Sequence, residues 1–286
     1  MDIRSEIREF LTSRRARISP EEIGVETRGP RRVPGLRRNE VAALAGVSLE
    51  YYTRLERGNL AGVSASVLEA IARALRLDDA ERAHLADLAR NCGPAVGRRS
   101  PRPSRAVRPS LQRMLDALTG APGLVLNGRT DLVAANALGR ALFSPLYERG
   151  DKPNHALFVF LDERAGQFWT DWSRVADDAV ALLHVQAARQ PHNQALAEVI
   201  GQLSTRSDQF RVRWARHDVR AHTTGRKRVH HPVAGPLELT FEVLTPAADG
   251  DQVLVVYGVE PGSPSQDALR LLAGWAATLQ QQPEQS

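Results

Sequence analysis

The stretch that most constrains the fold is residues 36–58, with the sequence LRRNEVAALAGVSLEYYTRLERG. It contains two short amphipathic segments with a tight joint between them. Apolar residues of the first segment recur at spacings of three and four, which predicts one buried helical face. That face comprises Val41, Leu44 and Ala45. At the joint, Gly46 can adopt the left-handed conformation that ends a helix, and Ser48 can cap the next helix.

The second segment, residues 48–57, is predicted to be the helix that follows the joint. Tyr52 and Leu55 face inward at helical spacing, and Gly58 ends the segment. The outward face carries Leu49, Glu50, Thr53 and Arg54. Two helices joined by so short a turn form a helix-turn-helix, whose second helix is the candidate for the DNA major groove. A helical bundle that binds protein instead of DNA is the alternative interpretation.

Charge is distributed unevenly along the chain. Residues 1–109 contain 21 Arg and 14 Asp or Glu, whereas the remaining residues contain 17 Lys or Arg and 19 Asp or Glu. The excess of positive charge therefore lies in the half that carries the helix-turn-helix. This asymmetry is expected when one domain binds a polyanion and the other does not.

A chain of 286 residues, 42% of them hydrophobic, is long enough for two domains with their own cores. No apolar run reaches the length of a membrane span, and the first ten residues are charged where a signal peptide would be apolar. Cys92 is the only cysteine, which excludes an intrachain disulfide and fits a reducing compartment. These features predict a cytoplasmic, nucleoid-associated protein without membrane contact.

Residues 1–92 are predicted to form a compact all-α domain of five helices. The expected helices are 5–17, the two of the motif, one that begins with a capping box at Ser66 and one that begins with a capping box at Asp78. The loop at 18–35 contains a basic run that includes Arg31 and Arg32. Beside a helix-turn-helix, such a run is expected to contact backbone phosphate, with insertion into the minor groove as a further option.

Residues 93–109 are rich in Pro, Ser and Arg and lack periodicity, which predicts an extended linker. Residues 110–280 then combine short apolar strands with helices, and residues 281–286 form a polar tail. Asn127-Gly128 is expected to join two strands as a hairpin, and three more strands are expected after residue 226. Helices inserted between these two sets predict an α+β domain with one antiparallel sheet.

The segment VAALAGVSLEYYTRLERG, followed by SVLEAIARAL, resembles the helix-turn-helix domain of the XRE (Cro/C1-type) transcriptional regulators. The turn glycine, the inward Leu55 and the closing Glu56-Arg57-Gly58 are in register. The resemblance implies contact with base edges by Ser48, Leu49, Glu50 and Arg54. It implies phosphate contact by Arg38 and Arg57 and an exposed position near the DNA for Tyr51. The predicted DNA-binding set is completed by Arg37, Thr53, Arg31 and Arg32.

Two features distinguish the chain from that family. Leu49 and Glu50 replace the amides common there, so the resemblance leaves the base preference open. By their chemistry, Arg54 favours guanine O6 and N7, and Glu50 can accept a hydrogen bond from cytosine N4. The loop before the motif is longer than in the phage repressors, so its arginines have no counterpart in them.

Short motifs in the second half carry a second resemblance. They are Asp171-Trp172, residues 207–210, residues 214–219, residues 225–227, His231-Pro232 with Gly235, and residues 260–263. Together they are similar to the MmyB-like ligand-binding domain of XRE regulators. The resemblance implies a PAS-like fold with a ligand pocket, which holds a fatty-acid-like molecule in at least one family member.

Aromatic residues are concentrated in this second half, and most of them are expected in the core. The aromatic residues predicted to line a ligand pocket are Phe143, Trp169, Trp172 and Trp214. A buried carboxylate requires a cationic or hydrogen-bonding partner. Arg213 and His217 are therefore predicted to anchor a ligand carboxylate at the pocket mouth, with surface salt bridges as the alternative for the arginine.

No metal site, cofactor or catalytic residue is predicted. His230 and His231 are neighbours on an expected strand, so their side chains point to opposite faces. The sequence also lacks a nucleophile elbow, a phosphate-binding glycine loop and an HExxH motif.

These patterns predict a one-component transcriptional regulator and not an enzyme. A homodimer is expected to bind a palindromic or pseudo-palindromic operator in double-stranded DNA. The C-terminal domain is expected to bind a small apolar ligand. Two alternatives stay open: a C-terminal domain that serves only for dimerisation or protein interaction, and an enzyme that uses the helix-turn-helix for targeting.

Overall fold

The computed structural model describes residues 3–21, 35–92, 107–148, 150, 153–218, 223–246 and 251–281. These residues form two compact units. Unit 1 contains the described residues up to 92, together with residues 184–197 and 212–218. Unit 2 contains the remaining described residues. Each unit has a hydrophobic core of its own.

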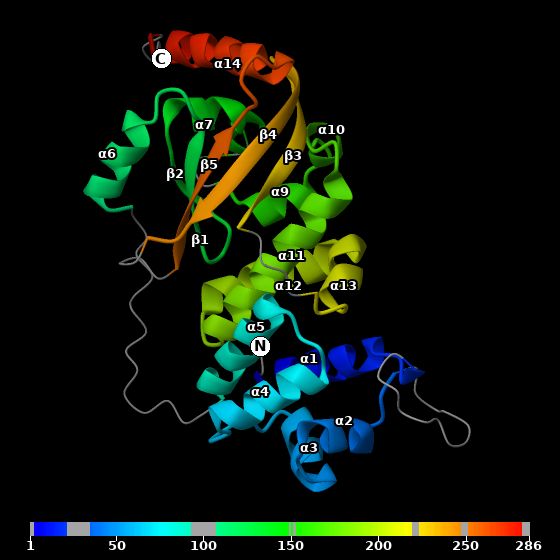
Figure 1. Cartoon of the computed structure of the whole chain (residues 1–286). Helices are drawn as coiled ribbons and strands as arrows, with labels where there is room; N and C mark the ends of the chain where they lie inside the picture. The colour runs from blue at the N-terminus through cyan, green and yellow to red at the C-terminus, as the bar shows by residue number, and fades with distance from the viewer. Residues whose placement is uncertain are drawn as a thin grey trace. The chain divides into compact units, whose positions relative to one another are not determined.

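Unit 1 is helical, as predicted, and begins with five helices (Figure 1). They are α1 (Ile3–Arg17), α2 (Arg38–Ala45), α3 (Leu49–Glu56), α4 (Ala65–Ala74) and α5 (Asp79–Asn91). Phe10 of α1 and Leu55 of α3 are fully buried in the shared core. Burial of such apolar side chains, each contributing about 1.5–3 kcal/mol, holds these short helices together.

Two details of unit 1 differ from the sequence-based expectation. Leu44 is 46% exposed, because the buried face of α2 runs through Val41 and Ala45 and the smaller Ala42. The N-cap of α4 is Ser64, which accepts a hydrogen bond from Val67 N at 3.3 Å, and not Ser66. The capping box at Asp78 is present as predicted.

Three helices from later in the chain contribute residues to both units. They are α11 (Trp172–Arg189), α12 (Gln194–Arg206) and α13 (Asp208–Trp214). Within unit 1, Ala188 of α11 is buried in the core, and its carbonyl accepts a hydrogen bond of 2.7 Å from Asn91 Nδ2. The packing unit that holds the helix-turn-helix is therefore larger than residues 1–92.

Unit 2 is built on one five-stranded antiparallel sheet, which confirms the α+β prediction. Its strands are β1 (Gly123–Asn127), β2 (Leu132–Ala135), β3 (Thr224–His231), β4 (Gly235–Leu244) and β5 (Gln252–Gly258). Their order is β2-β1-β5-β4-β3, so the early hairpin pairs with the last strand. In β3 and β4 buried and exposed residues alternate, because one face of the sheet packs on the core and the other meets solvent.

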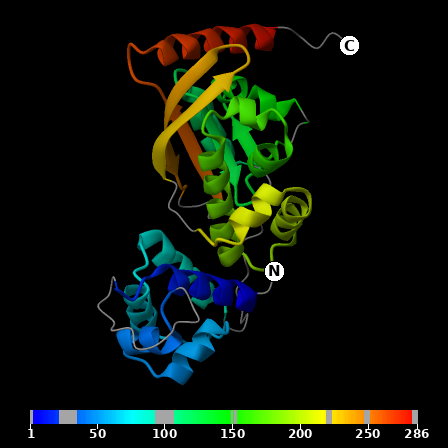
Figure 2. The same cartoon turned by 90° about the vertical axis from the view of Figure 1, so that its right-hand side faces the viewer.

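Helices cover one face of this sheet and the β1–β2 end of the other face. On one face, α6 (Pro109–Ala117) packs beside β2 and buries Leu115 against Val125 (Figure 1). The other face packs against α7 (Ala137–Leu142), α8 (Ser144–Tyr147), α9 (His155–Leu161), α10 (Ala165–Phe168) and the first part of α11. The last helix, α14 (Pro264–Gln281), packs against α7 and β4 (Figure 2).

Met114 of α6 was expected to face inward but is 68% exposed. In a helix of nine residues that lies on the sheet, the buried stripe runs through Leu111 and Leu115 and leaves Met114 outside it.

Candidate DNA interface and apolar cavity

The turn between α2 and α3 is built by one glycine and one serine. Gly46 has a φ of 66°, in the left-handed region that strains residues with a Cβ, and it ends α2. Val47 N donates to Ala42 O at 3.0 Å, which closes this helix end. Ser48 Oγ accepts from the backbone N–H of Tyr51 at 3.1 Å and caps α3. Both roles predicted for the joint are confirmed.

α3 has one buried face and one exposed face. Tyr52 and Leu55 are fully buried, as predicted. The side chains at its surface are Leu49, Glu50 and Arg54, with Tyr51 and Thr53 half-buried beside them. The guanidinium carbon of Arg54 lies 4.8 Å from the centre of the Tyr51 ring, so this aromatic face helps to position the guanidinium. The outward row that is predicted to meet base edges is therefore accessible.

Gly58 follows α3 where the chain passes close to the start of α1. Its φ is 96°, and a Cβ at this position would lie 2.5 Å from the backbone oxygen of Arg4. A side chain here would have to displace α1, since the clash is with backbone atoms. The glycine thus allows α1 to pack beside the end of α3.

Glu56, at the end of α3, is buried and neutralised by arginines. Arg15 of α1 donates to Oε1 at 2.9 Å and to Oε2 at 3.2 Å, and Arg38 of α2 donates to Oε1 at 3.1 Å. Thr12 adds a hydrogen bond of 3.1 Å. Burial opposes ionisation of this carboxyl, but the hydrogen bonds from the two arginines outweigh burial and lower its pKa. One carboxylate therefore connects all three helices around the turn.

The predicted phosphate contacts fall into three groups. Arg57 is exposed at the end of α3, and Arg37 is half-buried at the start of α2. Arg38 is half-exposed but shares its guanidinium with Glu56, so replacing it would also alter the buried ion pair. Arg31 and Arg32 lie outside the described residues.

Unit 2 contains an apolar cavity of about 80 Å³ between the sheet and α11. Its aromatic lining is formed by Phe143, Phe241 and Tyr257. Most of the remaining lining consists of leucine and valine side chains from the sheet. The polar groups of the cavity are His155, Asp178 and Lys227. A cavity lined largely by apolar side chains, with a few polar groups, is the arrangement typical of small-molecule sites.

Among the described residues, Lys227 is the only lysine or arginine that lines this cavity. Its Nζ lies 5.5 Å from the centre of the Trp169 ring, 5.1 Å from that of Phe241 and 4.0 Å from Asp178 Oδ2. Burial lowers the pKa of its ammonium to about 8, and the charge of Asp178 opposes this shift. The cavity therefore holds a cation at neutral pH, with aromatic faces and one distant carboxylate as compensation.

Comparison with protein families assigns both parts of the chain. The model of the MmyB-like transcription regulator ligand binding domain matches residues 107–272, which is more than half of the chain. The chain belongs to the MmyB-like transcription regulators. The model of a helix-turn-helix domain matches residues 6–85. Together the two matches make the MmyB-like regulator a DNA-binding transcription regulator with a ligand-binding domain. The sequence matches none of the curated proteins with which it was compared.

Within the described part of this MmyB-like regulator, no helix is both long enough and apolar enough to cross a membrane.

The residues predicted to bind a ligand in the MmyB-like regulator are divided between the two units. Phe143 lines the cavity, and Trp169 is fully buried beside Lys227. Trp172 is half-buried and donates from Nε1 to Val159 O at 2.8 Å, so its polar edge is used within the core. Of the aromatic set, Phe143 and Trp169 remain candidates for ligand contact.

Arg213, Trp214 and His217 lie in unit 1, and the cavity lies in unit 2. Trp214 stacks on His184, with ring centres 3.7 Å apart and an angle of 14° between the rings. That Arg213 and His217 anchor a ligand carboxylate, and that Trp214 lines the ligand pocket, stays a prediction. Arg213 and Trp214 belong to α13, and His217 follows it; α13 contributes residues to both units, which the sequence pattern did not indicate.

Lys227, which lines the cavity, was not among the residues predicted to bind a ligand. A signal was available, because the alternation along β3 places residue 227 on the same face as the buried Val229 and His231. A lysine at an inward position of a strand is uncommon, and it requires either a partner or a function.

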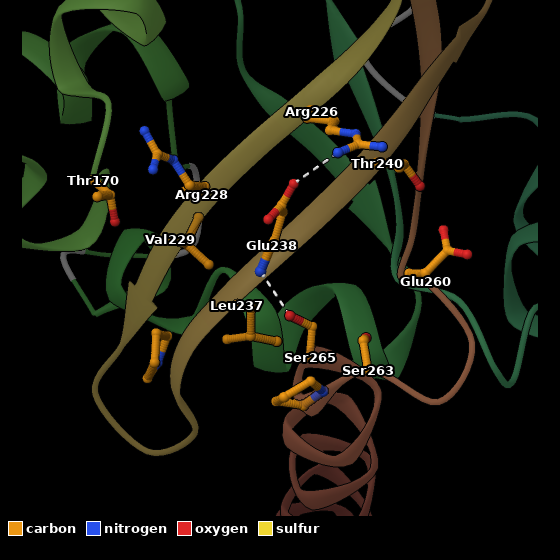
Figure 3. A pocket seen from close by; sticks show the side chains of 12 residues that line it. Thr170, Arg226, Arg228, Val229, Leu237, Glu238, Thr240, Glu260, Ser263 and Ser265 are labelled. Atoms are coloured by element: carbon orange, nitrogen blue, oxygen red, sulfur yellow. Dashed lines mark hydrogen bonds and ion pairs between the residues drawn. The ribbon is translucent and has the colours of Figure 1, made fainter.

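A second hollow, of about 610 Å³, lies on the exposed side of β3 and β4 beside the start of α14 (Figure 3). Three of its charged residues, Arg226, Arg228 and Glu238, are paired with one another or with a neighbour. Arg226 donates to Glu238 at 3.2 Å, and Ser265 Oγ accepts from the backbone N–H of Glu238 at 2.9 Å. Arg228 binds both carboxylate oxygens of Asp171, at 2.6 and 2.9 Å. This hollow is open to solvent, and its described lining offers no buried charge comparable to Lys227.

Proposed function

We propose that this MmyB-like regulator is a one-component transcription factor that binds its operator as a homodimer and responds to a small apolar acid. It acts in the cytoplasm, at the nucleoid. The observation that carries the proposal is the combination, in one chain, of an exposed α3 face and an apolar cavity with a buried ammonium. In this proposal the exposed face of α3 contacts the bases of DNA, and the cavity binds the small acid that regulates the protein.

In the proposed complex, α3 enters the major groove. Arg54 donates to guanine O6 and N7, Glu50 accepts from cytosine N4, and Leu49 contacts a thymine methyl group. Ser48, Tyr51 and Thr53 border this row. Contacts to phosphate come from Arg37, Arg38 and Arg57, and they fix the register without reading sequence.

The homodimer follows from the size of the reading surface. One short recognition helix covers only a few base pairs, so two copies are needed to define an operator. A two-fold dimer would read inverted half-sites about 34 Å apart, the distance of one turn of B-DNA.

The ligand is inferred from the chemistry of the cavity. A buried ammonium is costly to leave without a close anionic partner, and Asp178 lies only at 4.0 Å. A carboxylate at Lys227 would form a charge-assisted hydrogen bond in a site of low polarity. The alkyl part of the ligand would lie among Phe143, Tyr257 and the aliphatic lining. The proposed class is therefore an apolar carboxylic acid.

The size of the cavity bears on how the signal is transmitted. Its volume of about 80 Å³ is well below the roughly 300–1,000 Å³ of usual ligand pockets. A longer alkyl chain can enter only if lining side chains move, so the bound arrangement differs from the one described. A ligand shifts DNA binding only through such a difference in its affinity for the two arrangements.

The same small volume also favours the second candidate, in which the C-terminal domain serves only for dimerisation or protein interaction. Native mass spectrometry of the full chain, purified without added ligand or detergent, separates the two. A dimer that carries a small acid, released on denaturation, supports the proposed function. A ligand-free dimer that also takes up no alkyl carboxylic acid over a series of chain lengths supports the second candidate.

A further inference from the structure

Three buried side chains converge within unit 1. They are Glu6 of α1, His184 of α11 and His217, which follows α13. His184 Nδ1 lies 3.0 Å from Glu6 Oε1, and His217 Nε2 lies 3.8 Å from Glu6 Oε2. Glu9, one turn further along α1, brings Oε2 to 3.2 Å from the same His217 nitrogen. The donor atoms of Glu6, His184 and His217 all lie within 4.8 Å of one another.

The outer nitrogen of each imidazole faces a backbone carbonyl. His184 Nε2 lies 3.1 Å from Trp214 O, and His217 Nδ1 lies 3.3 Å from Ala215 O. A carbonyl oxygen can only accept, so each outer nitrogen carries a proton. The inner nitrogens, His184 Nδ1 and His217 Nε2, face carboxylate oxygens. A cation between an inner nitrogen and a carboxylate, either a second ring proton or a metal ion, compensates the carboxylate charge.

This pattern of outer contacts is the one that metal-binding histidines show. Their second ring nitrogen usually donates to a carbonyl or carboxylate, which fixes the ring and its tautomer. Stacking on Trp214 further fixes His184. His217 is held with a φ of 50°, a backbone conformation that costs energy and persists only where its surroundings impose it. Its inner nitrogen is buried and forms no hydrogen bond among the described residues.

We propose that Glu6, His184 and His217, with Glu9 as fourth ligand, form a binding site for a divalent transition-metal ion. Two imidazole nitrogens and carboxylate oxygens are the donor set that suits Zn²⁺. With bonds of about 2.0–2.2 Å, the ligand atoms of a tetrahedral site lie about 3.3–3.6 Å apart. His184 Nδ1 lies 3.0 Å from Glu6, and His217 Nε2 lies 3.2 Å from Glu9 and 3.8 Å from Glu6, so these distances bracket that range. Glu9 is 47% exposed, which gives an ion a route to the site.

No metal site was predicted from the sequence, because residues 6, 184 and 217 are remote along the chain. Metal binding here does not require the ligand proposed for unit 2. Its consequence is structural: an ion at this site would hold α1 to two segments that follow the linker in the sequence. Binding to the folded state alone would raise the stability of unit 1.

The test uses the full chain without a histidine tag, treated with a chelator and then dialysed. Isothermal titration with Zn²⁺ is expected to show one tight site per chain, and Co²⁺ is expected to give the intense visible absorption of a tetrahedral complex. His217→Gln and Glu9→Gln are expected to weaken Zn²⁺ binding by at least about tenfold. His192→Gln, an exposed histidine of the same unit, is the matched control and should leave binding unchanged.

Absence of a stoichiometric site in the wild-type chain would overturn the proposal, as would equal binding by His217→Gln and the wild type. Far-UV circular dichroism of each metal-free variant checks its folding first. If His217→Gln does not fold, Glu9→Gln decides the matter, because this side chain is half-exposed and its loss leaves no buried charge. Unchanged Zn²⁺ affinity and an unchanged Co²⁺ spectrum in Glu9→Gln would then count against the site.

Discussion

Arg15 donates to both carboxylate oxygens of Glu56, at 2.9 and 3.2 Å, and this contact ties α1 to the end of the recognition helix. Both side chains are buried. Their geometry means that α3 is positioned by a charge pair as well as by the apolar contacts of Tyr52 and Leu55.

Glu56→Gln is expected to lower the free energy of unfolding of unit 1 by about 3 kcal/mol. Removing one member of a buried ion pair leaves the other charge uncompensated, which costs about 3–5 kcal/mol. The amide that replaces the carboxylate can still accept a hydrogen bond from Arg15, so the expected loss of stability lies at the low end of this range. Urea denaturation followed by circular dichroism measures it, with the exposed Glu50→Gln as control. Equal stability of the two variants would show that the pair does not support α3.

Unit 1 is expected to lose stability as the pH falls from about 6.5 toward 4. His84 is buried against Phe10, and burial lowers the pKa of its imidazole to about 4. The unfolded chain takes up this proton near pH 6.5, whereas the folded chain does not, so stability present above pH 6.5 is lost through this window. The loss between pH 7 and 4.5 is about 2 kcal/mol.

Urea midpoints at several pH values measure this effect. His84→Leu should flatten the dependence between pH 6.5 and 4.5, whereas the exposed His192→Leu should leave it as in the wild type. An unaltered slope in His84→Leu would mean that another group titrates in this window.

Lys227→Met is expected to stabilise unit 2 by about 1–3 kcal/mol in the absence of ligand. The lowered pKa of Lys227 means that burial of the ammonium costs more than the contact with Asp178 at 4.0 Å returns, and methionine is of similar size. The same change should abolish the preference for an acid over its alcohol. Binding of dodecanoic acid and of dodecanol to the full chain measures that preference. Arg226→Met, on the exposed face of the same strand, should alter neither property. Loss of stability with unchanged acid binding would mean that Lys227 is a structural residue.

Gly46→Ala and Gly201→Ala are expected to have opposite effects. At Gly46 the φ of 66° strains any residue with a Cβ, so alanine should cost about 1 kcal/mol even though nothing lies within 4 Å of the added atom. Gly201 lies inside α12 with equally open surroundings, so alanine should gain about 0.5–1 kcal/mol there. Thermal unfolding compares the two, and a stabilising Gly46→Ala would refute the role given to the turn.

The local pattern predicted the helix-turn-helix well, because Gly46, Ser48 and Leu55 act within a few residues of one another. The pattern predicted burial wrongly at two positions in short helices. Leu44 and Met114 have helical spacing but lie at the margin of the buried stripe. The short helices α8, α9 and α10 also escaped prediction, since four to seven residues are too few for a periodic signal.

Sites assembled from distant segments were beyond the sequence pattern. Lys227 faces the cavity only because of the register of β3, and Glu6 meets His184 only because α11 extends into unit 1. For the same reason, the stacking of Trp214 on His184 was not predicted. Pairings across more than 100 residues depend on tertiary packing, which neither composition nor spacing records.

The central claim, that a dimer reads DNA through α3, is tested most directly by selecting duplexes from a randomised pool with the full-length wild type and Arg54→Ala. The wild type is expected to enrich two inverted half-sites one helical turn apart, each with an invariant guanine. Arg54→Ala should lose preference at that guanine, with a penalty of about 1–3 kcal/mol on the selected site, whereas Arg57→Ala should weaken all sequences alike. No enrichment by the wild type, or the same motif at the same affinity with Arg54→Ala, would contradict the claim.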